Sequence, residues 1–136
     1  MKFVHDTLGQ RVLFGQGLVV EHVGAEARRL GARKVMLIAS PREDALAARL
    51  TDVLQNVVRI DDVRQHVPLE HAVRIRGVAR DNAVDLLVAV GGGSATGLAK
   101  AVALTEELPI VAVPTTYSGS EGTNVWGLTD EGGKRT

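Results

Sequence analysis

The sequence contains no cysteine among its 136 residues, few aromatic side chains and no surplus of either charge. The absence of cysteine excludes disulfide bonds, thiol catalysis and zinc sites built on thiolates. Lysine plus arginine and aspartate plus glutamate each number 16, and this balance argues against nucleic acid as a partner. Redox chemistry in such a chain would therefore depend on a bound cofactor.

Long apolar runs and an apolar leader after a basic start are also missing. The residues after Met1 read KFVHDTLGQ, and no later apolar stretch approaches the ~20 residues needed to cross a bilayer. We therefore expect a soluble, cytoplasmic protein that does not bind membranes. No repeat or linker divides the chain, so we expect residues 1–136 to form one domain.

Alternation of two hydrophobic patterns indicates the fold class. Unbroken apolar runs at residues 35–39, 86–90 and 110–113 are typical of strands covered on both faces, and the half-polar residues 57–60 predict a strand nearer an edge. Helical spacing occurs between the runs, at Val20, Val23, Ala27 and Leu30, at Leu46, Leu50 and Val53, at Leu69, Ala72, Ile75 and Ala79, and at Ala95, Leu98, Val102 and Thr105. The alternation predicts an α/β fold with a doubly wound, mostly parallel, Rossmann-like sheet.

The last residues have a different pattern. Residues 124–129 predict a strand, 130–133 a glycine turn, and 134–136 the start of a returning strand. A domain that ends inside a hairpin leaves an unpaired edge. We therefore expect that residues are missing at the C-terminus.

The strongest chemical motif is Gly91-Gly92-Gly93-Ser94, at the point where a buried strand ends and a helix begins. Glycines there allow close approach to a ligand, and the N-terminus of a helix favours negative charge, so a phosphate or pyrophosphate is the expected ligand. Ser94 either caps the helix or donates its hydroxyl to the phosphate. The alternative is a glycine turn that only joins strand to helix.

The motif differs from two familiar nucleotide-binding patterns. The dinucleotide pattern G-x-G-x-x-G would need glycine where Thr96 stands. The phosphate-binding loop G-x-x-x-x-G-K-[ST] is matched at Gly92 and Gly97, but Leu98-Ala99 follows. Nucleotide hydrolysis is thereby disfavoured, and a redox dinucleotide held by a different loop remains.

A second polar loop, Pro114-Thr115-Thr116-Tyr117-Ser118-Gly119-Ser120-Glu121, also follows a buried strand. Its hydroxyl groups suit a ribose, an adenine edge or a phosphate, although such sequences also form solvated turns held by their own hydrogen bonds. Two loops that follow two strands of one parallel sheet converge at the same edge. We therefore expect both loops to contribute to one site.

Histidine gives no metal signal. His5, His22 and His71 lack metal-ligand spacing and are interpreted as ordinary surface or helix residues, and no His, Asp and Glu cluster matches a zinc or iron site. His66 stands two residues before Pro68, where a solvent-facing turn residue is the simpler interpretation.

The two loops resemble the signature loops of the iron-containing (type III) alcohol dehydrogenase superfamily. The resemblance lies in Gly91-Gly92-Gly93-Ser94 with Ala99-Lys100 six residues on, and in Pro114-Thr115-Thr116 followed by Ser118-Gly119-Ser120-Glu121. The chain is similar to the maleylacetate reductase branch in Gly97 (most of the superfamily has aspartate there), Tyr117, Trp126-Gly127, Phe14-Gly15-Gln16-Gly17 and His66-Val67-Pro68-Leu69-Glu70. The resemblance covers essentially the whole chain and implies the N-terminal, dehydroquinate synthase-like nucleotide domain.

The resemblance implies roles for individual residues. Gly91, Gly92, Gly93 and Ser94 would bind the cofactor pyrophosphate, Thr115, Thr116 and Ser118 would line the pocket near the adenine and ribose, and His66 would lie on a loop beside the cofactor. Ser40 stands where many relatives carry an aspartate that holds the adenosine ribose. Because that carboxylate would repel a 2′-phosphate, we expect NADPH to be tolerated alongside NADH.

The implied activity is reduction of maleylacetate to 3-oxoadipate, an unsaturated keto-dicarboxylate step in the degradation of aromatic compounds. The superfamily's C-terminal helical domain, which supplies the metal ligands or catalytic histidines, is absent, so no catalytic residue is expected in this chain. We therefore expect a homodimer or a partner chain to supply it. The alternatives are an inactive, truncated cofactor-binding module and another iron-type alcohol or glycerol dehydrogenase.

Overall fold

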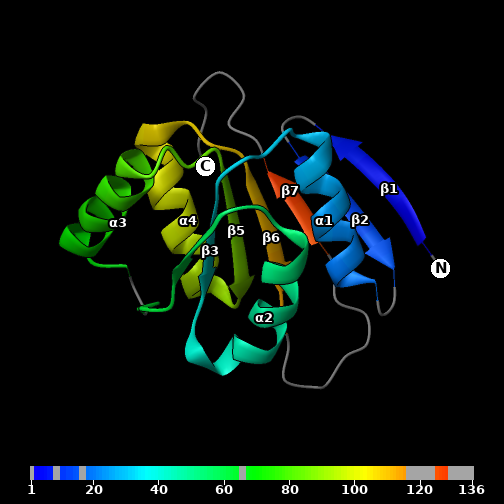
Figure 1. The fold of residues 1–136 in the computed structure, drawn as a ribbon, viewed down its shortest axis with the longest axis horizontal. Coiled ribbons are helices and arrows are strands. Elements are labelled where there is room, and N and C mark those ends of the chain that lie inside the picture. Colours follow the sequence, from blue (N-terminus) through cyan, green and yellow to red (C-terminus); the bar gives the residue numbers. More distant parts are fainter. Residues whose placement is uncertain (1, 8–9, 16–17, 65–66, 116–124, 129–136) are drawn as a thin grey trace.

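The computed structural model describes residues 2–7, 10–15, 18–64, 67–115 and 125–128. Within these residues the strands form one seven-stranded sheet in the order β1-β2-β7-β6-β5-β3-β4 (Figure 1). The strands are β1 (Lys2–Thr7), β2 (Gln10–Gly15), β3 (Val35–Ala39), β4 (Val57–Ile60), β5 (Leu86–Gly91), β6 (Ile110–Pro114) and β7 (Val125–Leu128). The helices are α1 (Val19–Arg29), the 3-10 turn η1 (Pro41–Glu43), α2 (Asp44–Val53), α3 (Leu69–Asp81) and α4 (Gly93–Glu106).

The sheet has a parallel half and an antiparallel half. Strand β5 lies between β3 and β6, and β4 lies beyond β3, all in parallel pairing. Strands β1, β2 and β7 pair antiparallel with their neighbours, and β7 joins this half to β6. The carboxyl ends of β3, β5 and β6 therefore lie at one edge, from which η1 and α4 begin (Figure 1).

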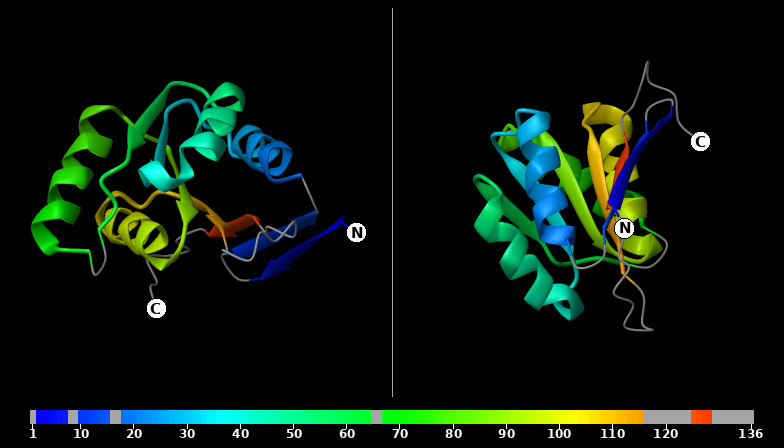
Figure 2. Two further views of the ribbon diagram at one scale, coloured as in Figure 1. Left: turned by 90° about the horizontal axis from the view of Figure 1, so that it is seen from below. Right: turned by 90° about the vertical axis from the view of Figure 1, so that its right-hand side faces the viewer.

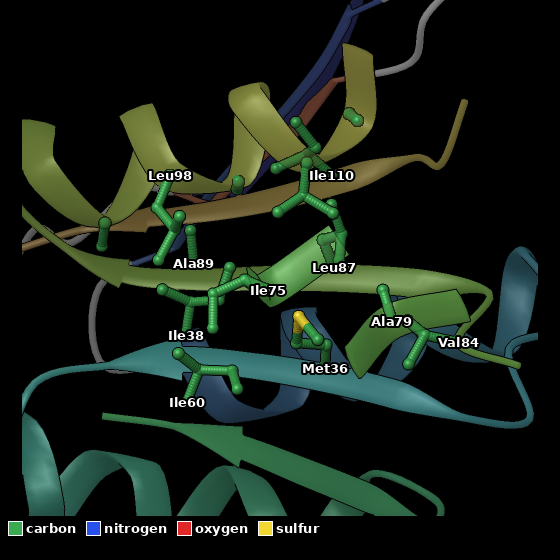
Figure 3. Packing of buried hydrophobic residues seen from close by; sticks show 14 residues of the cluster. Met36, Ile38, Ile60, Ile75, Ala79, Val84, Leu87, Ala89, Leu98 and Ile110 are labelled. Carbon is green, nitrogen blue, oxygen red and sulfur yellow. The ribbon is translucent and has the colours of Figure 1, made fainter. Parts of the chain in front are cut away.

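Helices cover both faces of the parallel half (Figure 2). The odd-numbered residues of β3 and even-numbered residues of β5 face α1 and α2, where Val23, Ala27, Ala47 and Leu50 are buried against them. The opposite sides of the strands face α3 and α4, and Figure 3 shows Met36 and Ile38 of β3 on the same side as Ile75 of α3 and Leu98 of α4. The unbroken apolar runs are thus explained, because a strand with two covered faces has no position for a polar side chain.

The ends of the helices have local causes. The chain leaves α1 through Leu30 and Gly31, and Gly31 has a φ of +68°, which glycine adopts without a steric penalty. Helix α4 ends at Glu106, and the next residue, Glu107, also has a left-handed φ of +53°, two residues before Pro109. The sharp stops return the chain to the sheet within a few residues.

The predicted fold class is confirmed, as are the strands at 35–39, 57–60, 86–90 and 110–113 and the helix between each pair of neighbours. The edge position expected for residues 57–60 is also confirmed, because β4 ends the sheet. Leu69 is an exception to its predicted stripe, since it is 72% exposed at the start of α3. Thr105 is exposed as well, at the last turn of α4.

The first strand of the predicted C-terminal hairpin is confirmed at residues 125–128. All four residues pair with β2 on one side, and Leu128, Gly127 and Trp126 pair with β6 on the other. Residues 129–136, where the turn and returning strand are expected, lie outside the described residues.

No helix in the described part of the chain is long and apolar enough to span a membrane.

Gly31 and Gly77 offer a matched test of backbone conformation. An added Cβ would meet no atom within 4 Å at either position, but only Gly31 has positive φ. Gly77→Ala, in the interior of α3, is expected to raise the free energy of unfolding by about 0.5–1 kcal/mol, whereas Gly31→Ala should lower it by about 1 kcal/mol. Urea unfolding of the two variants measures both changes, and equal effects would contradict the left-handed assignment.

Candidate functional site

The turn from β5 to α4 is built from glycines with different backbone requirements. Gly91 is buried with a φ of +129°, a conformation that side chains other than hydrogen rarely tolerate. Gly92 is extended and holds the position before α4, so Ser94 lies inside the helix and does not cap it. Of the two roles predicted for the Ser94 hydroxyl, the capping role is therefore wrong.

The same turn leaves space around its backbone. A Cβ added at Gly92 or Gly93 would meet nothing within 4 Å, whereas one at Gly91 would lie 3.8 Å from Glu43 Oε2. The first N–H groups of a helix have no partner inside the helix, and the helix dipole makes this end partly positive. The turn thus offers an open backbone surface with the electrostatic character that an anion requires.

This surface lies in a cavity of about 690 Å³. The cavity is lined by residues from the carboxyl ends of β3, β5 and β6, from the loop after β4 and from the first turn of α4. They are Ser40, Arg42, Glu43, Val63, Val90, Gly91, Gly92, Gly93, Ser94, Ala95 and Thr115. A volume of several hundred Å³ is typical of small-molecule sites.

The cavity brings together six of the residues that the sequence singled out. Ser40, Gly91, Gly92, Gly93, Ser94 and Thr115 all line it. His66, Thr116 and Ser118 lie outside the described residues. The cofactor-binding roles assigned to all nine residues remain predictions.

Glu43 links the turn after β3 to the loop after β6. Thr115 Oγ1 donates a hydrogen bond to Glu43 Oε2 at 3.0 Å, and the backbone N–H of Thr115 donates to the carbonyl of Gly91 at 3.3 Å. Glu43 and Thr115 are both half-buried residues. Three strand ends, those of β3, β5 and β6, are thereby tied together at one wall of the cavity.

Arg42, Glu43 and Val63 were missed as site residues. Arg42 and Glu43 belong to η1, directly after Ser40, so the rule that ligands bind beyond the carboxyl ends of parallel strands would have identified them. Val63 carries no chemical signal, and its place in the cavity depends on the path of the loop after β4.

That loop is held by a buried histidine. His71 of α3 is 2% exposed, and its Nε2 lies 2.6 Å from the carbonyl oxygen of Asp62. A hydrogen bond from Arg64 is the main cause that lowers the pKa of the Asp62 carboxyl; desolvation opposes it, and the electrostatic effects of Arg64, His71 and Arg74 lower the pKa further. Of the two positions expected for His71, on the surface or in a helix, the helix is confirmed and the surface is wrong.

The same holds for His22, which belongs to helix α1 and is only 8% exposed. Gly97 belongs to helix α4, and a Cβ added there would lie 3.6 Å from Val67 Cγ2. The helix position that carries aspartate in most of the resembled superfamily is thus packed against the loop after β4.

Among the described residues, no three His, Cys, Asp or Glu side chains come together as a metal site. The donor set expected of an iron or zinc centre is therefore not found in this part of the chain.

Comparison with known proteins identifies the family of the chain. The model of the family named iron-containing alcohol dehydrogenase matches residues 9–136. The chain belongs to the iron-containing alcohol dehydrogenase family. The predicted resemblance is thereby confirmed.

Curated relatives at high identity are maleylacetate reductases, which are oxidoreductases of this family. The enzyme of Pseudomonas sp. (strain P51) is 44% identical over 138 residues, which cover 100% of this chain and 39% of the relative. Maleylacetate reductase 2 of Cupriavidus pinatubonensis is 48% identical over 93% of this chain and 35% of the relative. The chain thus spans somewhat more than a third of the length of these enzymes.

Solved structures show the same fold. An iron-containing alcohol dehydrogenase from Corynebacterium glutamicum is 50% identical, with a TM-score of 0.71 over 78% of this chain and 30% of that one. Sulfoacetaldehyde reductase from Bifidobacterium kashiwanohense, solved in complex with NAD+, is 25% identical, with a TM-score of 0.67 over 75% of this chain and 33% of that one.

The contact between Thr115 and Glu43 is testable by stability. Thr115→Val removes the hydroxyl donor at nearly constant volume and should lower the free energy of unfolding by about 1 kcal/mol. Glu43→Gln keeps a side-chain oxygen acceptor and should cost less. A double-mutant cycle with Glu43→Ala measures the coupling by urea unfolding, and additive effects would show that the bond contributes nothing to stability.

Proposed function

We propose that the cavity at the carboxyl edge of β3, β5 and β6 binds NADH or NADPH, and that residues 1–136 form the nucleotide-binding domain of a maleylacetate reductase-type enzyme. The observation that carries the proposal is the open glycine surface at the N-terminus of α4, where no atom lies within 4 Å of a Cβ added at Gly92 or Gly93. Membership of an oxidoreductase family and the NAD+ complex of a relative support it.

The cofactor pyrophosphate would lie against Gly92, Gly93 and Ser94. Backbone N–H groups and the helix dipole would compensate its charge, and the Ser94 hydroxyl, free of a capping role, would donate a further hydrogen bond. The adenosine would then extend toward Ser40 and Thr115, which line the same cavity. Thr116, Ser118 and His66 would complete this pocket.

The proposed reaction is reduction of the carbon-carbon double bond of maleylacetate to give 3-oxoadipate. The bound dihydronicotinamide would supply hydride to one carbon, and a proton would be added to the other. The described residues contribute by binding and orienting the cofactor at a defined place. The activity belongs to the whole protein, because this chain spans 39% of the length of the relative from Pseudomonas.

A second candidate function is a cofactor-binding module without turnover. It is favoured by the lining of the cavity, because hydride transfer also requires the substrate to be held against the nicotinamide with water excluded. Within the described part of the cavity, Arg42 and Glu43 are the ionisable side chains, and Glu43 is bonded to Thr115. Either function requires the same cofactor site.

Calorimetric titration of the chain with NADH and NADPH tests cofactor binding directly. Gly92→Val fills the open space at the proposed pyrophosphate position and should weaken binding of both cofactors at least about tenfold. Its unfolding free energy should stay within about 0.5 kcal/mol of that of the parent chain, because a Cβ added at this position meets no atom within 4 Å.

Gly77→Ala is the matched control, since it alters a glycine of α3 outside the cavity and should leave both dissociation constants unchanged. Oxidation of NADH by maleylacetate, followed on the same sample, separates the two candidates. Turnover supports the reductase, and binding without turnover supports the module. Absence of binding, or equal binding by Gly92→Val, overturns the proposed site.

A further inference from the structure

The loop between β4 and α3 contributes an apolar side chain to the cavity. Val63 of this loop lines the cavity together with the glycine turn, and its half-buried side chain packs against the core cluster that contains Ile60 of β4 and Leu98 of α4. The other apolar side chains of the lining belong to Val90 and Ala95, which are buried almost completely. Val63 is therefore the apolar side chain of the described lining that a ligand can still reach.

The position of Val63 depends on contacts that its loop makes with other elements. Residues 61–64 belong to neither a helix nor a strand, so no ladder of backbone hydrogen bonds fixes them. The backbone N–H of Val63 donates to the carbonyl of Asp61 at 3.0 Å, which closes a tight turn inside the loop. Such a turn does not tie the loop to the rest of the molecule.

His71 of α3 ties the loop to the protein interior. The residue is 2% exposed, and its Nε2 lies 2.6 Å from the carbonyl oxygen of Asp62, the residue before Val63. The other ring nitrogen, Nδ1, lies 3.3 Å from Arg74 Nη2. A carbonyl oxygen only accepts hydrogen bonds and a guanidinium only donates them. Both contacts are therefore made when the imidazole is neutral and carries its proton on Nε2.

The remaining contacts of Asp62 are made nearer the surface. Arg64 donates to the two carboxylate oxygens of Asp62 at 3.1 and 2.8 Å, and Arg74 Nη2 lies 3.6 Å from Oδ2. The three side chains are 44–56% exposed, and ion pairs between groups this exposed contribute little to stability. A buried hydrogen bond is costly to leave unmade, so the contact from His71 is the one that fixes the loop.

We propose that His71 is a positioning residue of the cofactor site: its Nε2–H fixes the Asp62 carbonyl and thereby places Val63 against the bound cofactor. The inference rests on the proposed cofactor site and adds a residue that acts on it from outside, because His71 itself is not part of the described lining. Its effect on binding passes through Val63.

Calorimetric titration with NADH tests this role through two substitutions of His71. Glutamine carries an amide N–H close to the place of Nε2, whereas the shorter asparagine does not reach the Asp62 carbonyl. His71→Asn should weaken NADH binding about three- to tenfold, as Val63→Ala should, because each variant withdraws an apolar contact from the ligand. His71→Gln should restore the affinity to within about twofold of that of the parent chain.

A double-mutant cycle shows whether His71 acts through Val63. If it does, the combination of His71→Asn with Val63→Ala should bind NADH at most about twofold more weakly than Val63→Ala alone. Additive effects of the two substitutions would overturn the route through Val63.

Ala79→Gly is the matched control, because Ala79 is buried in the same helix about two turns beyond His71 and does not line the cavity. It should lower the free energy of unfolding, through lost helix propensity and packing, and leave the dissociation constant of NADH unchanged. A purely structural role of His71 would give the same pattern in His71→Asn, with lower stability in urea and unchanged affinity.

The protonation pattern of the ring is tested on the parent chain, without any substitution. Long-range proton–nitrogen NMR spectra of the imidazole at neutral pH should show a proton on Nε2 of His71 and none on Nδ1. A ring with its proton on Nδ1 could not donate to the Asp62 carbonyl and would overturn the proposal.

The failure of this proposal is distinguishable from the failure of the cofactor site. If NADH does not bind the parent chain, the proposed cofactor site is wrong, and the role of His71 in it is wrong as well. If NADH binds but His71→Asn binds it equally well, or His71→Gln does not restore the affinity, the cofactor site stands and the positioning role is overturned. Weak binding in His71→Asn that is restored in His71→Gln supports the proposal.

Discussion

The parallel pairing of β5 with β3 on one side and β6 on the other is the constraint on which the site depends. Parallel strands run in the same direction, so the residues that follow them meet at one edge. The register places Ala39 beside Val90 and Gly91 beside Pro114. Residues more than 70 positions apart in sequence, such as Glu43 and Thr115, are thereby brought within hydrogen-bonding distance.

Burial of the strands on both faces explains why polar chemistry is confined to that edge. Residues 86–91 of β5 are all buried, and the free energy gained by covering a leucine or valine side chain is about 1.5–3 kcal/mol. Any polar side chain within the strand would forgo this gain and would also need a partner. The first positions free of the constraint are those after the strand, where Gly92, Gly93 and Ser40 line the cavity.

Local patterns were sufficient for some parts of the molecule. Apolar runs and helical stripes located the parallel strands and their crossover helices, and glycine and hydroxyl residues at strand ends located Gly91 and Thr115 at one cavity, whereas Ser40 was found through the family resemblance. Strand partners were not predictable in this way, because the placement of β7 between β2 and β6 depends on segments far apart in sequence. Arg59 was missed for the same reason: its contacts to Ala39 and Ser40 cross from one strand to the next.

The cavity is lined partly by side chains that hydrogen bonds hold in place and partly by the exposed backbone of the glycine turn. Arg59 ties the turn after β3 to β4, and the bond between Glu43 and Thr115 ties it to β6, so the side chains around the glycine turn are held before any ligand arrives. Holding groups in place beforehand reduces the ordering cost of binding. The Glu43 carboxylate that accepts this bond also lies close to the glycine turn, because its Oε2 is 3.8 Å from a Cβ placed at Gly91. An anionic ligand at the turn would be repelled by this charge, so the backbone N–H groups and the dipole at the N-terminus of α4 would have to outweigh that repulsion.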